Sequence, residues 1–209
     1  MHDHGASASP PGWPLHIGFA GSRWLFAPHR LEPDRTRELE AALLRTLIER
    51  LAELPRRFER APSRPVRGLS QVAIGADTLF TLACAALGWR QQVLLPQAVD
   101  AFLAAGDPGE PDFTPAEQAA ARLLLRLPHI ESVRVASHAH DRIVQFEDTN
   151  AAILAASDAI VCMVRDGAHA RPGGTRDLMQ RAALAGKPVG LLRVSLRDGQ
   201  AQLSPWSMA

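Results

Sequence analysis

Two glycine-containing segments carry the residue types that bind phosphate groups. Gly21–Arg23 follows the apolar run Leu15–Ala20, and Gly173–Thr175 follows a second apolar run, Ala159–Val164. Glycine lets a ligand approach the backbone, hydroxyl groups donate hydrogen bonds, and a guanidinium group pairs with phosphate oxygens. Each segment lies between a predicted strand and a predicted helix, whose N-terminal N–H groups favour an anion. The pattern predicts a phosphate site formed by Gly21, Ser22, Arg23, Gly173, Gly174 and Thr175.

A third segment of this kind contains Gly75 and Asp77, after the predicted strand Val66–Ala73. Gly75 allows the chain to turn sharply into the next helix. The Asp77 carboxylate either accepts hydrogen bonds from ribose hydroxyls or is simply favoured by the helix N-terminus. Asn150, on a helix expected at Glu147–Ala156, is a candidate for contact with a base. Ligands of open parallel sheets bind beyond the carboxyl ends of the strands, so we expect all three segments to converge there.

Other chemistries find less support in the residues. Gly18–Gly21 lacks the three-glycine spacing of the dinucleotide fingerprint, and no Gly-Lys-Ser/Thr of a P-loop occurs. Ser22 has no evident histidine and aspartate partners for a serine-type hydrolase. His138, His140 and Asp141 have metal-ligand side chains but need further partners, so a solvated loop is favoured. We expect neither a metal nor a cofactor.

Two aromatic residues follow the first glycine segment, and their role is open. Trp24 and Phe26 either stack on a bound base or cover the end of the sheet as part of the core.

Apolar runs alternate with amphipathic segments along the chain. Asp34 is the expected N-cap of the first helix, and Thr114 with Glu117 forms a capping box for a later one. Long surface connections are expected at 55–65 and 97–115, the second of which is a candidate lid. The predicted strands are 15–20, 66–73, 92–95, 131–137, 159–164 and 189–194, and the predicted helices are 34–53, 75–88, 115–126, 147–156 and 174–185.

Strands that alternate with helices in this way predict a three-layer α/β/α sandwich with a mostly parallel, Rossmann-like sheet. Both faces of such a sheet are covered, which suits strands that are continuously apolar. We expect a disordered N-terminal tail at 1–13, a single α/β domain at 14–197 and a C-terminal tail at 198–209 that is loosely attached.

Composition narrows the class of protein. The chain has 209 residues, 46% of them hydrophobic and 22% charged, and a formal net charge of +1. This charge gives no overall attraction to nucleic acid or membrane, so we expect neither as a partner. Cys84 and Cys162 lie in apolar surroundings and suggest buried thiols in a reducing compartment. With no signal-peptide pattern at the N-terminus, a cytoplasmic location is expected.

The order of these motifs resembles the SLOG superfamily of Rossmann-like domains, which includes DprA-type DNA-processing proteins, LOG-type phosphoribohydrolases and nucleotide-sensing domains. The resemblance covers roughly residues 15–194. The motifs that carry it are Ile17–Arg23, Ile74–Asp77, Ser157–Val164 leading to Gly173–Thr175, and Ala182–Pro188. It implies a nucleotide-like small-molecule ligand and a homodimer, because members of the family often self-associate.

The chain departs from the phosphoribohydrolases at the second glycine segment. Their longer Pro-Gly-Gly-x-Gly-Thr loop and nearby glutamate are replaced here by Pro172–Thr175 and Asp177, and Arg142 is only a loose match to their helix arginine. Cleavage of an N-glycosidic bond needs a correctly placed carboxylate. The leading hypothesis is therefore nucleotide binding or sensing. Arg142 and Asp177 form the catalytic pair of the alternative enzyme hypothesis, and single-stranded DNA binding is a further alternative.

Overall fold

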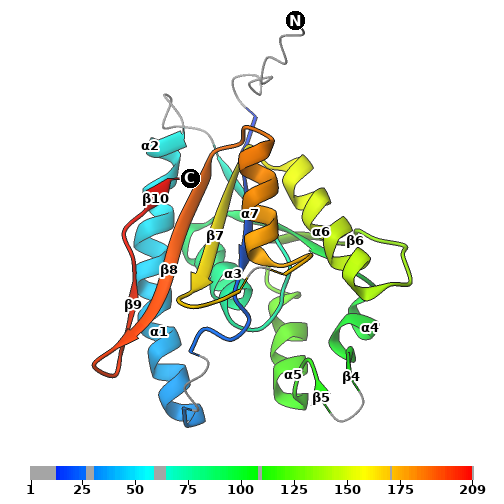
Figure 1. The fold of residues 1–209 in the computed structure, drawn as a ribbon, viewed down its shortest axis with the longest axis horizontal. Coiled ribbons are helices and arrows are strands. Elements are labelled where there is room, and N and C mark those ends of the chain that lie inside the picture. Colours follow the sequence, from blue (N-terminus) through cyan, green and yellow to red (C-terminus); the bar gives the residue numbers. More distant parts are fainter. Residues whose placement is uncertain (1–12, 27–30, 59–64, 108–109, 170, 209) are drawn as a thin grey trace, which may run out of the picture.

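The computed structural model describes residues 13–26, 31–58, 65–107, 110–169 and 171–208. Its main element is an eight-stranded sheet in the order β10-β8-β7-β1-β2-β3-β6, with β9 also paired to β8 (Figure 1). All pairs from β8 to β6 are parallel, while β9 and β10 are antiparallel to β8. The strands are β1 Leu15–Gly21, β2 Val66–Ser70, β3 Arg90–Leu95, β6 Ile130–Val135, β7 Ala159–Arg165, β8 Val189–Arg197, β9 Gln200–Leu203 and β10 Ser207–Met208.

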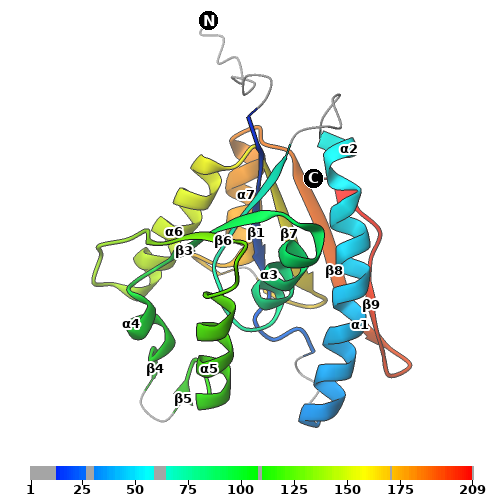
Figure 2. The same cartoon turned by 180° about the vertical axis from the view of Figure 1, so that it is seen from behind.

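Helices cover both faces of this sheet. One face packs against α1 (Pro33–Ala52) and α3 (Ala76–Leu87), with α5 (Pro115–Leu124) beside α3. The opposite face packs against α6 (Arg142–Ala156) and α7 (Thr175–Leu184), as the two opposite views show (Figures 1 and 2). The predicted α/β/α sandwich with a mostly parallel sheet is confirmed.

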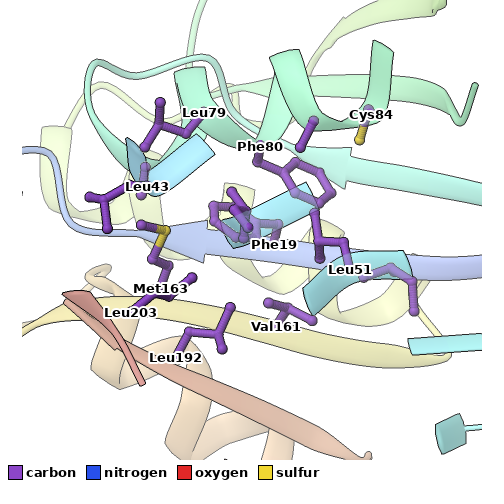
Figure 3. Packing of buried hydrophobic residues seen from close by; sticks show 14 of the residues in the cluster. Phe19, Leu43, Leu51, Leu79, Phe80, Cys84, Val161, Met163, Leu192 and Leu203 are labelled. Atoms are coloured by element: carbon purple, nitrogen blue, oxygen red, sulfur yellow. The ribbon is translucent and has the colours of Figure 1, made fainter. Parts of the chain in front are cut away.

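The larger core lies between the sheet and the α1–α3 layer (Figure 3). Leu39, Leu43, Leu47 and Leu51 recur at helical spacing and are all buried, which explains why α1 lies flat on the sheet. The ring of Phe19 on β1 stacks on that of Phe80 on α3, with centroids 4.3 Å apart. This packing fixes α3 against β1, the strand that leads into the first glycine segment.

Several local signals in the sequence are confirmed at atomic detail. Thr114 and Glu117 form the reciprocal capping box of α5. Gly88 ends α3 in the left-handed conformation, as a C-cap glycine does. Cys84 and Cys162 are both buried free thiols.

Helix α1 begins differently from the prediction. Its N-cap is Glu32, whose side chain makes no capping hydrogen bond, and Asp34 lies inside the first turn. Pro33 at the first helical position explains the shift, since its fixed φ suits that position and it needs no hydrogen-bond partner there.

The two connections expected to be surface loops contain regular structure. Leu54–Phe58 forms helix α2, with Leu54 in the core, while residues 59–64 lie outside the described part. The candidate lid contains helix α4 (Val99–Leu103) and the short pair β4 (Gly106–Asp107) and β5 (Glu110–Pro111). Phe102 and Phe113 pack against each other in a cluster that also contains Leu95 of β3 and Ala121 of α5, so this segment is anchored to the domain.

The C-terminal segment was expected to be loosely attached, and this expectation is wrong for its described part. Strand β9 extends the sheet through pairing with the end of β8, and Leu203 packs into the main core. Asp198 and Gly199 form the turn between them, with φ of 50° and 71°. Positive φ at both central residues is the signature of a tight two-residue hairpin, for which Asp-Gly is a strong sequence signal. The predicted N-terminal tail, 1–13, lies almost entirely outside the described residues.

No helix in the described ranges combines the length and apolar character needed to cross a membrane.

Candidate functional site

The strand order reverses between β1 and β7. From β1 the chain moves outward through β2, β3 and β6, and it then returns to the other side of β1 with β7 and β8. Gly21 at the end of β1 is paired with Met163 on β7, so the two strands end side by side. The glycine segments that follow them are thus neighbours, as the sequence predicts.

The first glycine segment is tied to the end of β7. The backbone N–H of Ser22 donates to the carbonyl of Met163 at 2.9 Å, and the Ser22 hydroxyl oxygen accepts from the backbone N–H of Arg165 at 3.0 Å. Ser22 therefore holds two strand ends together, and its hydroxyl hydrogen remains able to donate to a ligand.

Gly75 is needed because two loops touch at this point. Its φ is +80°, and a Cβ built on it would lie 2.1 Å from the carbonyl oxygen of Arg23. The next residue, Ala76, donates its N–H to the carbonyl of Ser22 at 3.2 Å. The predicted sharp turn is present, and it also packs the N-terminus of α3 directly against the first glycine segment.

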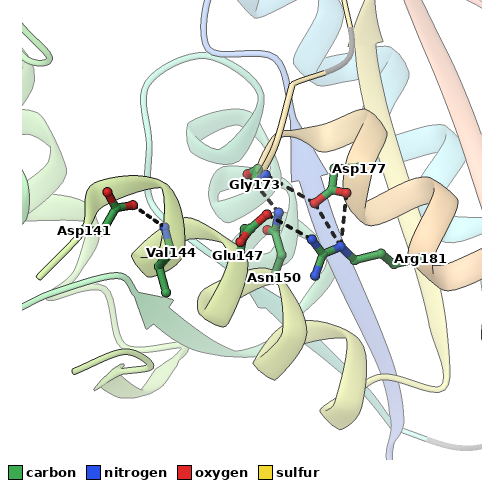
Figure 4. A network of polar contacts seen from close by, with 7 residues as sticks. All are labelled: Asp141, Val144, Glu147, Asn150, Gly173, Asp177 and Arg181. Carbon is green, nitrogen blue, oxygen red and sulfur yellow. Dashed lines mark hydrogen bonds and ion pairs between the residues drawn. The ribbon is translucent and has the colours of Figure 1, made fainter. Parts of the chain in front are cut away.

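The second glycine segment is held by side chains of α6 and α7 (Figure 4). Asn150 donates from Nδ2 to the carbonyl oxygen of Gly173 at 2.9 Å, and Asp177 accepts from the N–H of Gly173 at 3.2 Å. Gly173 has a φ of +66°, and a Cβ on it would lie 2.9 Å from that of Phe146. Helix α7 begins immediately afterwards, and its N-cap, Gly174, supplies no side-chain cap.

A cavity of about 270 Å³ lies between these two segments. Ser22, Gly174 and Thr175 all line it. Four arginines also line it: Arg23, Arg165, Arg171 and Arg176. Among its described lining residues there is no acidic side chain. Positive charge therefore gathers at the N-terminus of α7, where the helix dipole also favours an anion.

The arginines of this cavity differ in their partners. Arg23 is paired with Asp112, Nη1 to Oδ1 at 3.0 Å, and its guanidinium lies 5.3 Å from the centre of the Phe113 ring. None of the described ion pairs involves Arg171 or Arg176, and the Nε of Arg176 is buried without a hydrogen-bond partner. Arg171 and Arg176 are thus the side chains best able to neutralise a bound anion.

A second cavity of about 60 Å³ adjoins the first and shares several of its walls, Gly21, Arg23, Arg171, Gly174 and Thr175. Asp77, Asn150 and Gln71 are its polar lining residues apart from these. Burial raises the pKa of Asp77 to about 7, although backbone hydrogen bonds at Ala73 and Gly21 and the charge of Arg23 act in the opposite direction. Gly75 packs against the first glycine segment and lines neither of these two cavities.

The candidate catalytic pair is not brought together. Asp177 accepts a hydrogen bond from Arg181 Nε at 3.1 Å, and Arg181 also bonds Glu147 on α6 at 3.1 Å. Arg142, at the start of α6, pairs instead with Asp112. Neither Arg142 nor Asp177 is among the residues that line the two cavities. Both side chains are placed where they hold elements together.

The two aromatic residues after the first segment have different environments. Phe26 is buried in the main core. Trp24 is 58% exposed and lines the arginine cavity, so Trp24 is the one placed to stack on a ligand.

The residues considered for a metal site lie at the start of α6. Asp141 is the N-cap of α6, and its side chain accepts from the N–H of Val144 at 3.0 Å. In the described ranges, no three His, Cys, Asp or Glu side chains gather closely enough to hold a metal ion.

The sequence did not single out Gln71, Arg165, Arg171 or Arg176. Arginine is the common basic residue of this chain, which hid the three that share a cavity. Their positions gave a usable signal, because Arg165 ends the key strand and Arg171 and Arg176 flank the second glycine segment. Gln71 follows β2 directly, at the same edge of the sheet.

Comparison with known proteins gives a likeness of fold. No family model and no curated protein matches the sequence. Among solved structures, DNA processing protein A (DprA) from Streptococcus pneumoniae matches with a TM-score of 0.51 at 16% identity, over 90% of this chain and 53% of that chain. The chain thus spans about half the length of that protein. The likeness agrees with the Rossmann-like fold that the SLOG resemblance implied, and fold alone does not define function.

Proposed function

We propose that this chain binds a nucleotide or a nucleotide-derived phosphate ligand at the carboxyl edge of its sheet. The observation that carries the proposal is the cavity of about 270 Å³ lined by four arginines at the uncapped N-terminus of α7. In this proposal Arg171, Arg176 and the first N–H groups of α7 bind the phosphate. The hydroxyls of Ser22 and Thr175 donate to its remaining oxygens.

The arrangement of the other residues supports a binding role. Asn150 and Asp177 each form a hydrogen bond with Gly173 in the second glycine segment, which keeps the backbone around the cavity fixed. A binding site gains affinity when its groups are already in place before the ligand arrives. Trp24, exposed beside the cavity, offers a flat surface to a base.

The proposal is tested by removing the two arginines that the ion-pair network leaves available. We expect inorganic phosphate and nucleoside monophosphates to raise the melting temperature of the wild-type protein, because a ligand of the folded state stabilises it by mass action. Replacement of Arg171 and Arg176 by glutamine should weaken binding at least about tenfold, the loss of roughly one charge-assisted hydrogen bond. Isothermal titration calorimetry measures both constants.

Arg134→Gln provides the matched control, because Arg134 is exposed on the edge strand β6 away from the cavity. This variant should bind as the wild type does. If no phosphate compound binds, or if the double variant binds as tightly as the control, the proposal is wrong.

A further inference from the structure

The smaller cavity contains two residues that each have a buried oxygen without a hydrogen-bond partner. These atoms are Oδ1 of Asp77 and Oε1 of Gln71. The two residues are 6% and 9% exposed. A buried acceptor without a partner costs roughly 1–3 kcal/mol, and native proteins contain few of them. Two in one cavity of about 60 Å³ mark a place where hydrogen-bond donors are favoured.

Both residues are held at the carboxyl end of β2. Gln71 follows β2 directly, and the Ser70 hydroxyl donates to the Gln71 carbonyl at 2.7 Å. Asp77 lies in the first turn of α3, whose start is packed against the first glycine segment. Asn150, the other polar residue that this cavity does not share with the arginine cavity, donates from its amide nitrogen to Gly173. Among the residues that line this cavity, Asp77 and Gln71 supply the buried acceptors that have no partner.

The size of the cavity limits what those donors are. About 60 Å³ gives room for a few groups of the size of a water molecule, at roughly 10–15 Å³ each. Hydroxyl groups fit this space. The cavity shares the walls Gly21, Gly174 and Thr175 with the arginine cavity, so its occupant lies next to a bound phosphate. In a nucleotide the group next to the phosphate is the sugar.

We infer that Asp77 and Gln71 form a sugar subsite that accepts hydrogen bonds from the two adjacent hydroxyls of a ribose phosphate, and that the chain therefore selects ribonucleotides over 2′-deoxyribonucleotides. This inference rests on the proposed phosphate binding and adds the sugar to it. The 2′-deoxy ligand leaves one buried acceptor unpaired, whereas the ribose form pairs both.

The test compares ligands that differ by one hydroxyl group. Isothermal titration calorimetry is run with ribose 5-phosphate and 2-deoxyribose 5-phosphate, and with AMP and 2′-deoxy-AMP. We expect the ribose form of each pair to bind the wild-type protein about tenfold more tightly, as one hydrogen bond to a buried acceptor contributes. This comparison needs no variant and so does not depend on how substitutions affect folding.

Two variants assign the discrimination to its residues. Gln71→Leu removes the amide acceptor at similar volume, and Asp77→Ala removes both carboxyl oxygens. In each variant the ratio of the two dissociation constants should fall to about threefold or less. Gln202→Leu, an exposed position on β9, is the matched control and should keep the wild-type ratio. Circular dichroism checks that each variant is folded.

The outcomes separate the two proposals. Equal binding of ribose and deoxyribose forms, or a preference set only by the base, overturns the sugar subsite and leaves phosphate binding in place. A tenfold preference that survives in both folded variants overturns the assignment to Asp77 and Gln71. Absence of binding by every phosphate compound overturns the proposed function and the sugar subsite together.

Discussion

At the residue scale, the least expected property belongs to Asp77. Its carboxyl group is buried at the start of a helix, where the sequence alone gave equal weight to a ligand contact and to a simple dipole interaction. Burial raises its pKa to about 7, and Arg23 is the charged group that opposes this shift. A carboxylate that only interacts with the helix dipole is expected at the surface, where water stabilises its charged form.

This environment predicts a dependence of stability on pH. The pKa of Asp77 is raised from 3.8 to about 7 on folding, so the folded state binds its proton more tightly between these values. The wild type therefore loses stability as pH rises through this window. Asp77→Asn carries no such proton. The free energy of unfolding of this variant, relative to wild type, should rise from about pH 4 to about pH 8 by at most about 4 kcal/mol.

Urea unfolding of both proteins across this pH range measures the difference. A relative free energy that stays constant with pH would show that the Asp77 carboxylate is ionised and well solvated in the folded protein. Other titrating groups are common to both proteins and cancel in the comparison.

Residues whose role depends on backbone shape could be predicted from the sequence. Gly75 lies between a strand and a helix, and its positive φ and close contact with Arg23 follow from that position. The role of Gln71, Arg171 and Arg176 depends on a cavity that forms only when distant segments meet, so the sequence offers only their positions beside β2 and the second glycine segment as a signal. A side chain that is common in the composition gives no signal of its own.

Among the elements, α7 contributes most to the proposed phosphate site, through its N-terminus. Gly174 is its N-cap and lines both cavities. Its φ of −90° and ψ of 175° are open to any residue, so glycine is not required there by backbone strain. A Cβ at this position would lie 2.9 Å from Cγ of Arg171 and 3.0 Å from its carbonyl oxygen, and would therefore crowd the entrance to the helix N-terminus.

Gly174→Val should consequently fold and fail to bind phosphate. We expect its dissociation constant for AMP to rise at least about tenfold, while its circular dichroism spectrum stays that of the wild type. Ala183→Val, on an exposed position of the same helix, carries the same β-branched residue away from the site and should bind normally. Unchanged binding by Gly174→Val would remove the N-terminus of α7 from the proposed site.

The elements themselves were predicted unevenly. Amphipathic helices and buried strands have clear periodic patterns, so their positions agree with the structure to within a few residues at most ends, α6 being longer than expected. Helix α4 and strand β9 were missed. Short elements carry too few residues for a periodic pattern, and they are fixed by tertiary contacts such as those of Phe102 and Leu203.

At the scale of the whole molecule, strand order creates the site. The chain places β1 between β2 and β7, and this reversal brings the ends of three strands and the starts of two helices to one edge. The alternation of strands and helices predicted this architecture, because right-handed crossovers leave few other arrangements. The DprA structure shares the fold at 16% identity, which shows that the arrangement tolerates extensive change in sequence.

Nucleotide binding as proposed requires the arginine cavity to hold a phosphate group. A crystal structure of the protein soaked with AMP tests it most directly. We expect density for the phosphate at the N-terminus of α7, within hydrogen-bond distance of Arg171 or Arg176 and between Ser22 and Thr175. An empty cavity at saturating AMP, or a phosphate bound at another face of the protein, would contradict it.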